Sequence, residues 1–162
     1  MVVEAAGPQL VIDVPAWVDA VTASGRVVAA GVNSVVRRQN SVLHAEIVAL
    51  MLAQQRVGSF TLRGPGLPAH ELVTSCEPCA MCLGATLWSG VSRLVIAATR
   101  EDAMAVGFEE GPVFPESYAY IAERGVTTVW GVRRAEAASL LRGYRDGGGA
   151  IYNAVPPPGR AG

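Results

Sequence analysis

Apolar residues occur in short runs along this chain, and the runs change between strand-like and helix-like spacing. Residues 18–22 and 27–32 flank a Ser-Gly pair, a pattern that predicts an antiparallel hairpin. Residues 71–75, 92–99 and 126–130 predict three further strands. Residues 92–99 are almost entirely apolar, which is typical of a strand that is buried on both faces.

Segments with helical spacing separate these strands. Asn40 and Ser41 would cap a helix that runs from about residue 42 to residue 56 and ends at Gly58. Pro78 suits the first position of a helix, where its missing N–H needs no partner, and it predicts a second helix over residues 78–88. Shorter helices are predicted over residues 101–106, 116–124 and 133–144.

Strands that alternate with helices are typical of α/β proteins. We therefore expect a three-layer α/β/α sandwich with a mixed five-stranded sheet and helices on both faces. A chain of 162 residues, of which 51% are hydrophobic, is long enough for a sizeable core. We expect one domain over residues 1–153 and a flexible, Pro- and Gly-rich tail over residues 154–162. Residues 10–14 could form one more strand, which Pro15 would interrupt.

The charge balance argues against a large nucleic-acid interface. The chain has 13 basic residues, all of them Arg, against 14 acidic ones, so its net charge is −1. No apolar run is long enough to span a membrane, and no basic leader precedes Glu4. The three cysteines lie within seven residues of one another, which indicates metal or thiol chemistry in a reducing compartment. We therefore expect a cytoplasmic protein that binds a small molecule.

His44, Cys79 and Cys82 offer the ligand set of a catalytic zinc site. Zn²⁺ binds neutral imidazole and thiolate readily, and a catalytic site has three protein ligands and one position for water. Glu46 lies two residues from the histidine, so it could act on that water without binding the metal. Together with Pro78, these residues match H-x-E…P-C-x-x-C, the signature of zinc-dependent nucleobase deaminases.

The expected chemistry follows from these groups. Zinc lowers the pKa of a bound water to about 7, which provides a hydroxide nucleophile at neutral pH. Hydroxide would attack an sp² carbon that carries an exocyclic amine. Glu46 would take the proton of the water, pass it to the ring nitrogen and later protonate the leaving amine.

A structural zinc site is the main alternative, and it needs a fourth ligand. Cys76 or His70 could supply one, but the His-x-Glu half of the pattern has no role in such a site. Cys76 ends a predicted strand and lies outside the Pro-Cys-x-x-Cys frame, and His70 is expected to be exposed in a turn. Arg37 and Arg38 are expected in a solvated turn rather than against a phosphate.

These motifs resemble the cytidine deaminase-like superfamily. Residues 74–88 (T-S-C-E-P-C-A-M-C-L-G-A-T-L-W) look like its bacterial guanine deaminase branch, and residues 105–110 (A-V-G-F-E-E) are similar to that branch's A-G-F-acid-acid stretch. The resemblance covers about residues 15–130, and more loosely the chain up to residue 153.

The resemblance implies the roles of several further residues. Asn33 would form a hydrogen bond with the base, Trp88 would line the base pocket and Glu110 would read the base edge. Glu136 and Tyr152 would match pocket residues near the C-terminus. The resemblance also implies a homodimer, in which the C-terminal segment can be exchanged between subunits.

The implied activity is that of a hydrolase acting on C–N bonds of cyclic amidines, which converts guanine to xanthine and ammonia with Zn²⁺ as cofactor. Two departures keep other substrates open. The acidic pair is Glu109-Glu110, where the branch prefers Asp-Asp, and the first 14 residues do not have the pattern of the family's first helix. A related nucleoside or heterocycle (guanosine, cytidine), tRNA adenosine and a non-enzymatic zinc-stabilised module are the alternatives.

Overall fold

The structure is a computed structural model that describes residues 17–22 and 26–154, with side chains from Arg26 onward. The strand predicted over residues 10–14 lies outside the described residues, as does the predicted tail from residue 155 onward. None of the helices in the described part of the chain is long and apolar enough to span a bilayer.

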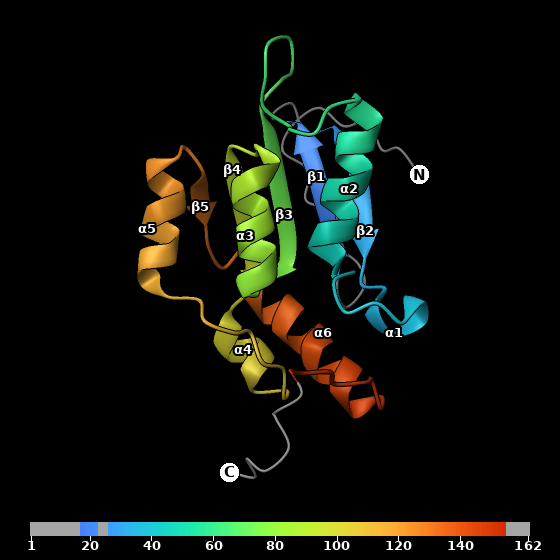
Figure 1. The fold of residues 1–162 in the computed structure, drawn as a ribbon. Coiled ribbons are helices and arrows are strands. Elements are labelled where there is room, and N and C mark those ends of the chain that lie inside the picture. Colours follow the sequence, from blue (N-terminus) through green and yellow to red (C-terminus); the bar gives the residue numbers. More distant parts are fainter. Residues whose placement is uncertain (1–16, 23–25, 155–162) are drawn as a thin grey trace.

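One mixed sheet forms the centre of the described chain, with the strand order β2-β1-β3-β4-β5 (Figure 1). β1 pairs antiparallel with both β2 and β3, whereas β3, β4 and β5 are parallel. The strands are β1 (Trp17–Thr22), β2 (Val27–Val32), β3 (His70–Cys76), β4 (Arg93–Ala98) and β5 (Thr127–Val129). From Leu94 to Ala98 every residue of β4 is buried, as its apolar sequence predicts for a strand covered on both faces.

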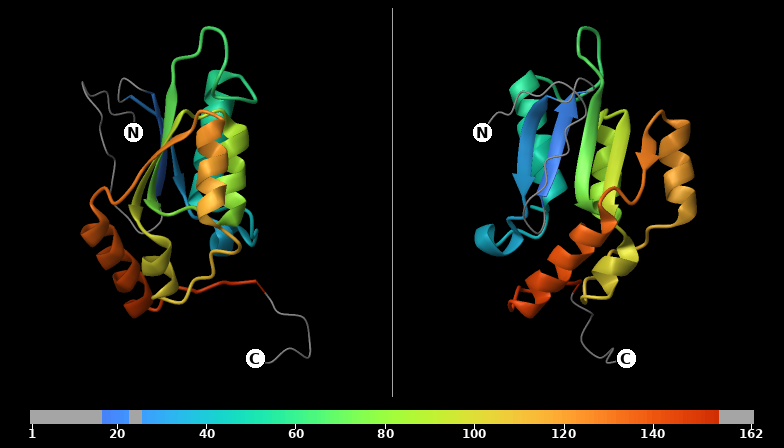
Figure 2. Two further views of the ribbon diagram at one scale, coloured as in Figure 1. Left: turned by 90° about the vertical axis from the view of Figure 1, so that its left-hand side faces the viewer. Right: turned by 180° about the vertical axis from the view of Figure 1, so that it is seen from behind.

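Helices cover both faces of the sheet, which confirms the predicted α/β fold. The helices are α1 (Val35–Arg38), α2 (Ala45–Val57), α3 (Ala80–Ser89), α4 (Arg100–Met104), α5 (Pro115–Glu123) and α6 (Arg134–Asp146). α2, α3 and α5 lie side by side on one face, and α6 lies on the other (Figure 2). Ala137 of α6 packs there against Ala97 and Ala98 of β4.

The packing of α2 against β2 fixes where α2 begins. Gly31 lies on β2, and a Cβ atom added there would come within 2.0 Å of the Ala45 carbonyl oxygen. A glycine is therefore needed for this close approach. The Arg56 guanidinium at the other end of α2 donates to the Val28 carbonyl at 2.6 Å. These contacts hold both ends of α2 against β2.

The carboxyl ends of β3 and β4 meet the start of α3 and of α4. Cys76 and Ala98 are register partners at the ends of the two parallel strands. The Glu77 N–H donates to the Ala98 carbonyl at 2.9 Å, and α3 starts three residues later. In an open α/β sheet, ligands bind outside the carboxyl ends of parallel strands, so this edge is where a site is expected.

The starts of α2 and α3 differ from the predictions by three and two residues. The first long helix begins at Ala45 rather than near residue 42, and the next at Ala80 rather than Pro78, so His44 and Cys79 are both N-cap residues. The polar turn expected near Arg37 and Arg38 contains the short helix α1, although both side chains are exposed as predicted.

His70 is buried, which corrects its predicted exposure. It is the first residue of β3 and only 1% exposed. Its Nδ1 lies 2.9 Å from the Leu62 carbonyl oxygen, so the ring is hydrogen-bonded to the connection that precedes the strand. A buried imidazole with such a partner has a structural role at the end of the sheet away from Cys76.

Candidate metal centre and active site

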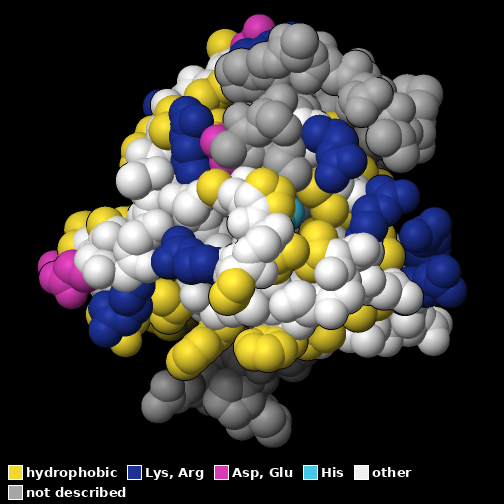
Figure 3. Space-filling view, turned by 90° about the horizontal axis from the view of Figure 1, so that it is seen from above, with side chains coloured by type: hydrophobic (Ala, Val, Ile, Leu, Met, Phe, Trp, Pro, Cys, Tyr) yellow, Lys and Arg dark blue, Asp and Glu magenta, His cyan; other side chains and the backbone are white. Residues whose placement is uncertain are grey.

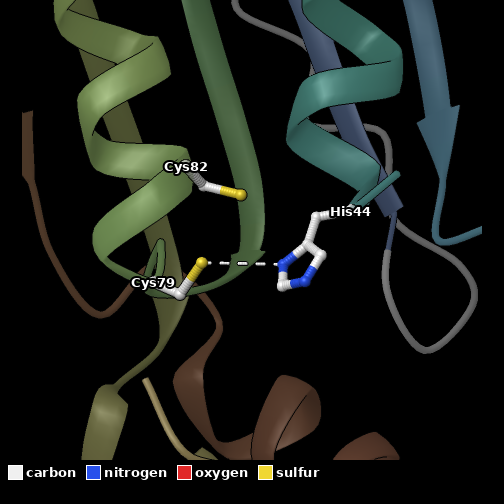
Figure 4. A group of neighbouring side chains, drawn as sticks. All are labelled: His44, Cys79 and Cys82. Carbon is white, nitrogen blue, oxygen red and sulfur yellow. Dashed lines mark hydrogen bonds between the residues drawn. The ribbon is translucent and has the colours of Figure 1, made fainter. Parts of the chain in front are cut away.

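Three side chains from the starts of two helices converge on one point. His44 is the N-cap residue of α2, Cys79 is the N-cap residue of α3, and Cys82 lies in the first turn of α3. Their ligand atoms all lie within 4.8 Å of one another, and the Cys79 Sγ is 3.6 Å from the His44 Nδ1 (Figure 4). Neither N-cap side chain caps its own helix, so both point to the shared centre.

This geometry fits a tetrahedral zinc ion. Zn–S bonds of about 2.3 Å and Zn–N bonds of about 2.0–2.1 Å place sulfur and nitrogen about 3.6 Å apart. Among the described residues no fourth His, Cys, Asp or Glu joins the three, so one position is left for a non-protein ligand. The fourth ligand that a structural site needs is therefore supplied by neither Cys76 nor His70.

The hydrogen bond between Cys79 and Cys82 shifts the pKa values of the two thiols in opposite directions. A hydrogen bond from Cys82, together with one from His44, lowers the pKa of Cys79 to about 4. The same bond raises the pKa of Cys82, and burial raises it further. The pKa of His44 is raised, chiefly by its hydrogen bond with Cys79. The lowered pKa of Cys79 favours the thiolate form, which is the form that binds a dication.

A cavity of about 300 Å³ opens in front of this centre. Its size is at the lower end of the range for small-molecule sites, which suits a ligand of the size of a free base. Residues from the carboxyl end of β3, the start of α2, the loop after α4 and the C-terminal segment line it. Its polar and aromatic lining includes Asn33, His44, Glu46, Cys76, Glu77, Cys79, Phe108, Glu110 and Tyr152.

Glu46 and Glu110 line this cavity, and the pKa of each carboxyl is raised. Glu46 is half-buried on α2, and burial raises its pKa. Glu110 lies in the loop before α5, where burial and the charge on Cys79 raise the pKa of its carboxyl to about 7. Groups whose pKa is shifted toward neutral pH beside a metal site are suited to proton transfer.

Asn33 and Tyr152 form the third wall. The Asn33 side-chain amide donates to the Tyr152 hydroxyl, and its carbonyl accepts the Val35 N–H at 3.2 Å. The Tyr152 ring lies edge-on to the His44 ring, with 5.8 Å between the centroids. An amide is therefore held in place beside the metal centre by a tyrosine from the C-terminal segment of the same chain.

Comparison with known families is consistent with this site. Residues 12–98 match the sequence pattern described as the cytidine and deoxycytidylate deaminase zinc-binding region. The chain belongs to this family. The match includes all three candidate zinc ligands and Glu46, so the zinc-binding character of this deaminase family coincides with the centre described above.

Individual deaminases resemble the chain over different lengths. Guanine deaminase of Bacillus subtilis (strain 168) is 35% identical over 92 residues, 57% of this chain and 56% of that protein. A solved structure of guanine deaminase from Nitrosomonas europaea is 45% identical with a TM-score of 0.79, over 80% of this chain and 72% of that one. The tRNA-specific adenosine deaminase of Buchnera aphidicola is 26% identical over 74% of this chain and 72% of that protein. The chain thus spans little more than half the length of the Bacillus enzyme.

The structure does not bring Trp88 to the site, which corrects the prediction that it lines the base pocket. Trp88 lies in the last turn of α3 and is 80% exposed, and it does not line the cavity. Six residues of helix separate it from Cys82, which is about 9 Å along the axis. Glu136 does not line the cavity either; it is exposed on α6 and pairs with Arg133 at 3.3 Å.

Phe108 and Asn153 also line the cavity, although neither was predicted as a site residue. The Phe108 ring lies between the rings of Tyr152 and Tyr144, at centroid distances of 5.6 and 6.2 Å. Asn153 also lines the cavity, and its side chain accepts the Glu109 N–H and donates to the Gly107 carbonyl, both at 2.9 Å. Phe108 stands in the A-V-G-F-E-E stretch, so its position beside the acidic pair was the available signal. Asn153 had no such signal.

Proposed function

We propose that this chain is a zinc-dependent hydrolase that deaminates a free purine base, converting guanine to xanthine and ammonia. The observation that carries the proposal is a metal centre with three protein ligands that shares one cavity with the Glu46 carboxyl. The similarity to guanine deaminases from two bacteria supports the choice of substrate.

The reaction exchanges one bond at the purine C2 carbon. A water oxygen forms a bond to C2, the C2–N bond of the amino group breaks, and ammonia leaves. Zinc held by His44, Cys79 and Cys82 would supply a nucleophilic hydroxide at neutral pH. Glu46 would take one proton from the water and deliver it to a ring nitrogen, and it would then take the proton of the new C2 hydroxyl and deliver it to the amine before it leaves. Its pKa, raised by burial, makes the carboxyl better able to hold each proton during its transfer.

Binding of the base would use the opposite walls of the cavity. A carboxylate at Glu110 can accept hydrogen bonds from a ring N–H and an amino group on the same edge of guanine. The Asn33 amide offers both a donor and an acceptor, and the Tyr152 and Phe108 rings offer apolar surface. A hydrogen-bonded site of this kind discriminates against bases that leave its polar groups unpaired.

We also propose that the chain folds as a single domain and forms a homodimer. Large apolar side chains are exposed on the outer faces of α2 and α3, among them Met51, Leu52 and Trp88, and this would suit a homodimer. The three free cysteines would suit a cytoplasmic location, and the single sheet a single domain over residues 1–153. Light scattering coupled to size-exclusion chromatography would measure the mass in solution.

The likeness to tRNA-specific adenosine deaminase makes tRNA the second candidate substrate. It would need a basic surface, but acidic residues outnumber basic ones by one. On the end of the molecule seen in Figure 3, Arg side chains stand in separate groups among neutral and hydrophobic ones. Binding of tRNA that weakens steeply with salt, with deamination of its adenosine, would assign this substrate instead.

Ammonia release from a panel of amines tests the proposal. Protein of measured zinc content would be given guanine, guanosine, adenosine, cytosine and cytidine separately. We expect ammonia from guanine, with xanthine formed in equal amount. Ammonia from a nucleoside but not from guanine would change the substrate class, and zinc-loaded protein that releases no ammonia from any of these or from tRNA would contradict the deaminase proposal.

A further inference from the structure

The segment that carries Glu110 into the cavity is held from two sides. On one side, the Ala80 N–H at the start of α3 donates to the Glu110 carbonyl at 2.9 Å. On the other side, the Arg100 guanidinium donates to the Gly111 carbonyl at 2.8 Å and to the Val113 carbonyl at 2.5 Å. Hydrogen bonds from an ionised donor are stronger than neutral ones, so Arg100 is the stronger of the two anchors.

Arg100 is itself fixed to the segment that carries the metal ligands. Its backbone N–H donates to the Glu77 carboxylate at 2.8 Å, and the Tyr118 hydroxyl donates to the other oxygen of that carboxylate at 2.8 Å. Glu77 stands two residues before Cys79. One carboxylate therefore links the zinc-ligand segment to the start of α4 and to α5.

The held segment has little freedom to find another arrangement. Gly111 has a φ of 69°, and a Cβ atom there would lie 3.2 Å from the Ala80 side chain. Val113 is buried and belongs to the main hydrophobic core. The backbone is thus fixed on both sides of Gly111. The position of the Glu110 carboxyl therefore depends on the hydrogen bonds from the Ala80 N–H and from the Arg100 guanidinium. Arg100 does not line the cavity, so it cannot act on a ligand directly.

We propose that Arg100 is a positioning residue, which fixes the Glu110 carboxyl relative to the metal ligands and thereby sets the selectivity of the site for the edge of a purine base. The inference rests on the proposed function for its substrate class. Its structural part, that Arg100 holds the segment from Glu110 to Val113, can be tested without any activity.

The test compares three variants of the full-length, zinc-loaded protein. Arg100→Met removes both donors at similar length, and Arg100→Lys keeps the charge without the two-pronged geometry. Arg63→Met is the matched control, because Arg63 also donates to backbone carbonyls, those of Val91, Arg124 and Gly125, but lies away from the cavity. Each would be assayed for kcat and KM with guanine, for affinity for 8-azaguanine, and for amide hydrogen exchange over residues 107–113.

We expect Arg100→Met to lower kcat/KM for guanine by about tenfold to a hundredfold, the loss that misplacing a binding group by about 1 Å can cause. Affinity for 8-azaguanine falls in parallel, zinc content is unchanged, and Arg100→Lys recovers part of the loss. In a Glu110→Gln background, Arg100→Met adds less than a twofold loss of affinity, because Arg100 acts through Glu110. Arg63→Met leaves affinity and selectivity as in the wild type.

The inference is overturned if Arg100→Met behaves like Arg63→Met, or if its loss of affinity is undiminished in the Glu110→Gln background. Hydrogen exchange decides the structural part even when the wild-type protein deaminates no base. Faster exchange over residues 107–113 in Arg100→Met alone supports it, and unchanged exchange contradicts it. Failure of the wild-type protein to release ammonia would contradict the proposed function instead, so the two failures can be told apart. If Arg100→Met does not fold, Arg100→Lys carries the same comparison.

Discussion

His44 and Cys79 occupy equivalent positions, since each precedes its helix with an extended backbone (ψ of 157° and 171°). Ser, Thr, Asp and Asn are the usual residues at such positions, because their side chains bond the free N–H groups of the first turn. Here neither side chain makes a capping bond. Both side chains are positioned to bind the metal instead. Neither helix therefore has the stabilisation that a capping side chain would provide.

Replacement of Glu46 is expected to separate zinc binding from turnover. We expect Glu46→Ala to keep its zinc, because Glu46 is not one of the three ligand residues. Turnover should fall by about 10²- to 10⁴-fold, the usual contribution of a general acid–base group. Metal analysis and ammonia release measure the two properties. Glu123→Ala, which removes an exposed acid, should behave as wild type, and full activity of Glu46→Ala would refute the assigned role.

At the scale of elements, replacing Gly31 or Gly84 with alanine is expected to change the free energy of unfolding in opposite directions. Gly31→Ala places a methyl group against the backbone of α2 and should lower the free energy of unfolding by about 1–3 kcal/mol. Gly84 lies inside α3 with nothing within 4 Å of an added Cβ atom. Gly84→Ala should raise that free energy by about 0.5–1 kcal/mol. Urea unfolding measures both, and equal effects would contradict the close packing of α2 on β2.

Asp102 joins α4 to α6 and gives the fold a pH-dependent contact. The Asp102 carboxylate accepts two hydrogen bonds from the Arg134 guanidinium, at 2.8 and 3.2 Å, and one from the Thr99 N–H at 2.9 Å. The bond with Arg134 lowers the pKa of Asp102 to about 2. A lowered pKa means that the contact stabilises the fold above the unfolded-state pKa of about 3.9 and is lost as the pH falls toward 2.

Asp102→Asn should therefore lower the Tm at pH 7 by about 2–4 °C, comparable to the loss of one helix cap. The difference from wild type should shrink as the pH is lowered from 4 toward 2, where the wild-type carboxylate also becomes protonated. Asp146→Asn is the control, since Asp146 is exposed at the end of α6 and pairs with its neighbour Arg145. A Tm difference that does not change with pH would contradict the assignment.

Local sequence patterns predicted most helices and strands, because the formation of these elements depends mainly on their own side chains. Apolar runs gave the described strands within two residues, since burial of a strand depends on its own side chains. The starts of α2 and α3 were less predictable, because the ligand roles of His44 and Cys79 hold their backbones extended and delay each helix. His70 appeared to be a turn residue because its partner, the Leu62 carbonyl, comes from a connection without periodicity.

At the scale of the whole molecule, the zinc ligands could be predicted but the rest of the cavity only in part. The ligands follow from residue type and spacing, which a sequence displays directly. The Asn33–Tyr152 hydrogen bond joins residues 119 positions apart, and no local pattern reports such a contact. The position of Trp88 was predicted wrongly because the number of residues between it and Cys82 does not show that α3 runs away from the metal centre.

Chelation of the metal should lower the stability of the whole molecule. The three ligands hold the starts of α2 and α3 together, so zinc binds the folded chain in preference to the unfolded one. Free zinc at about 100 times its Kd would add about 2.7 kcal/mol to the free energy of unfolding. Thermal melts with and without a chelator would show a lower Tm for the metal-free protein. Cys79→Ser/Cys82→Ser should be insensitive to the chelator, and a wild-type Tm that survives proven loss of zinc would contradict this.

The connection between α2 and β3 lies at the far end of the sheet from the metal centre (Figure 1). Its base is fixed by Leu62, which is fully buried, whereas Pro65 and Gly66 at its tip are exposed. Exposed tips of this kind tolerate added sequence. A reporter peptide or an immobilisation handle spliced between Pro65 and Gly66 would therefore leave the reactive end of the molecule facing away from the attachment point.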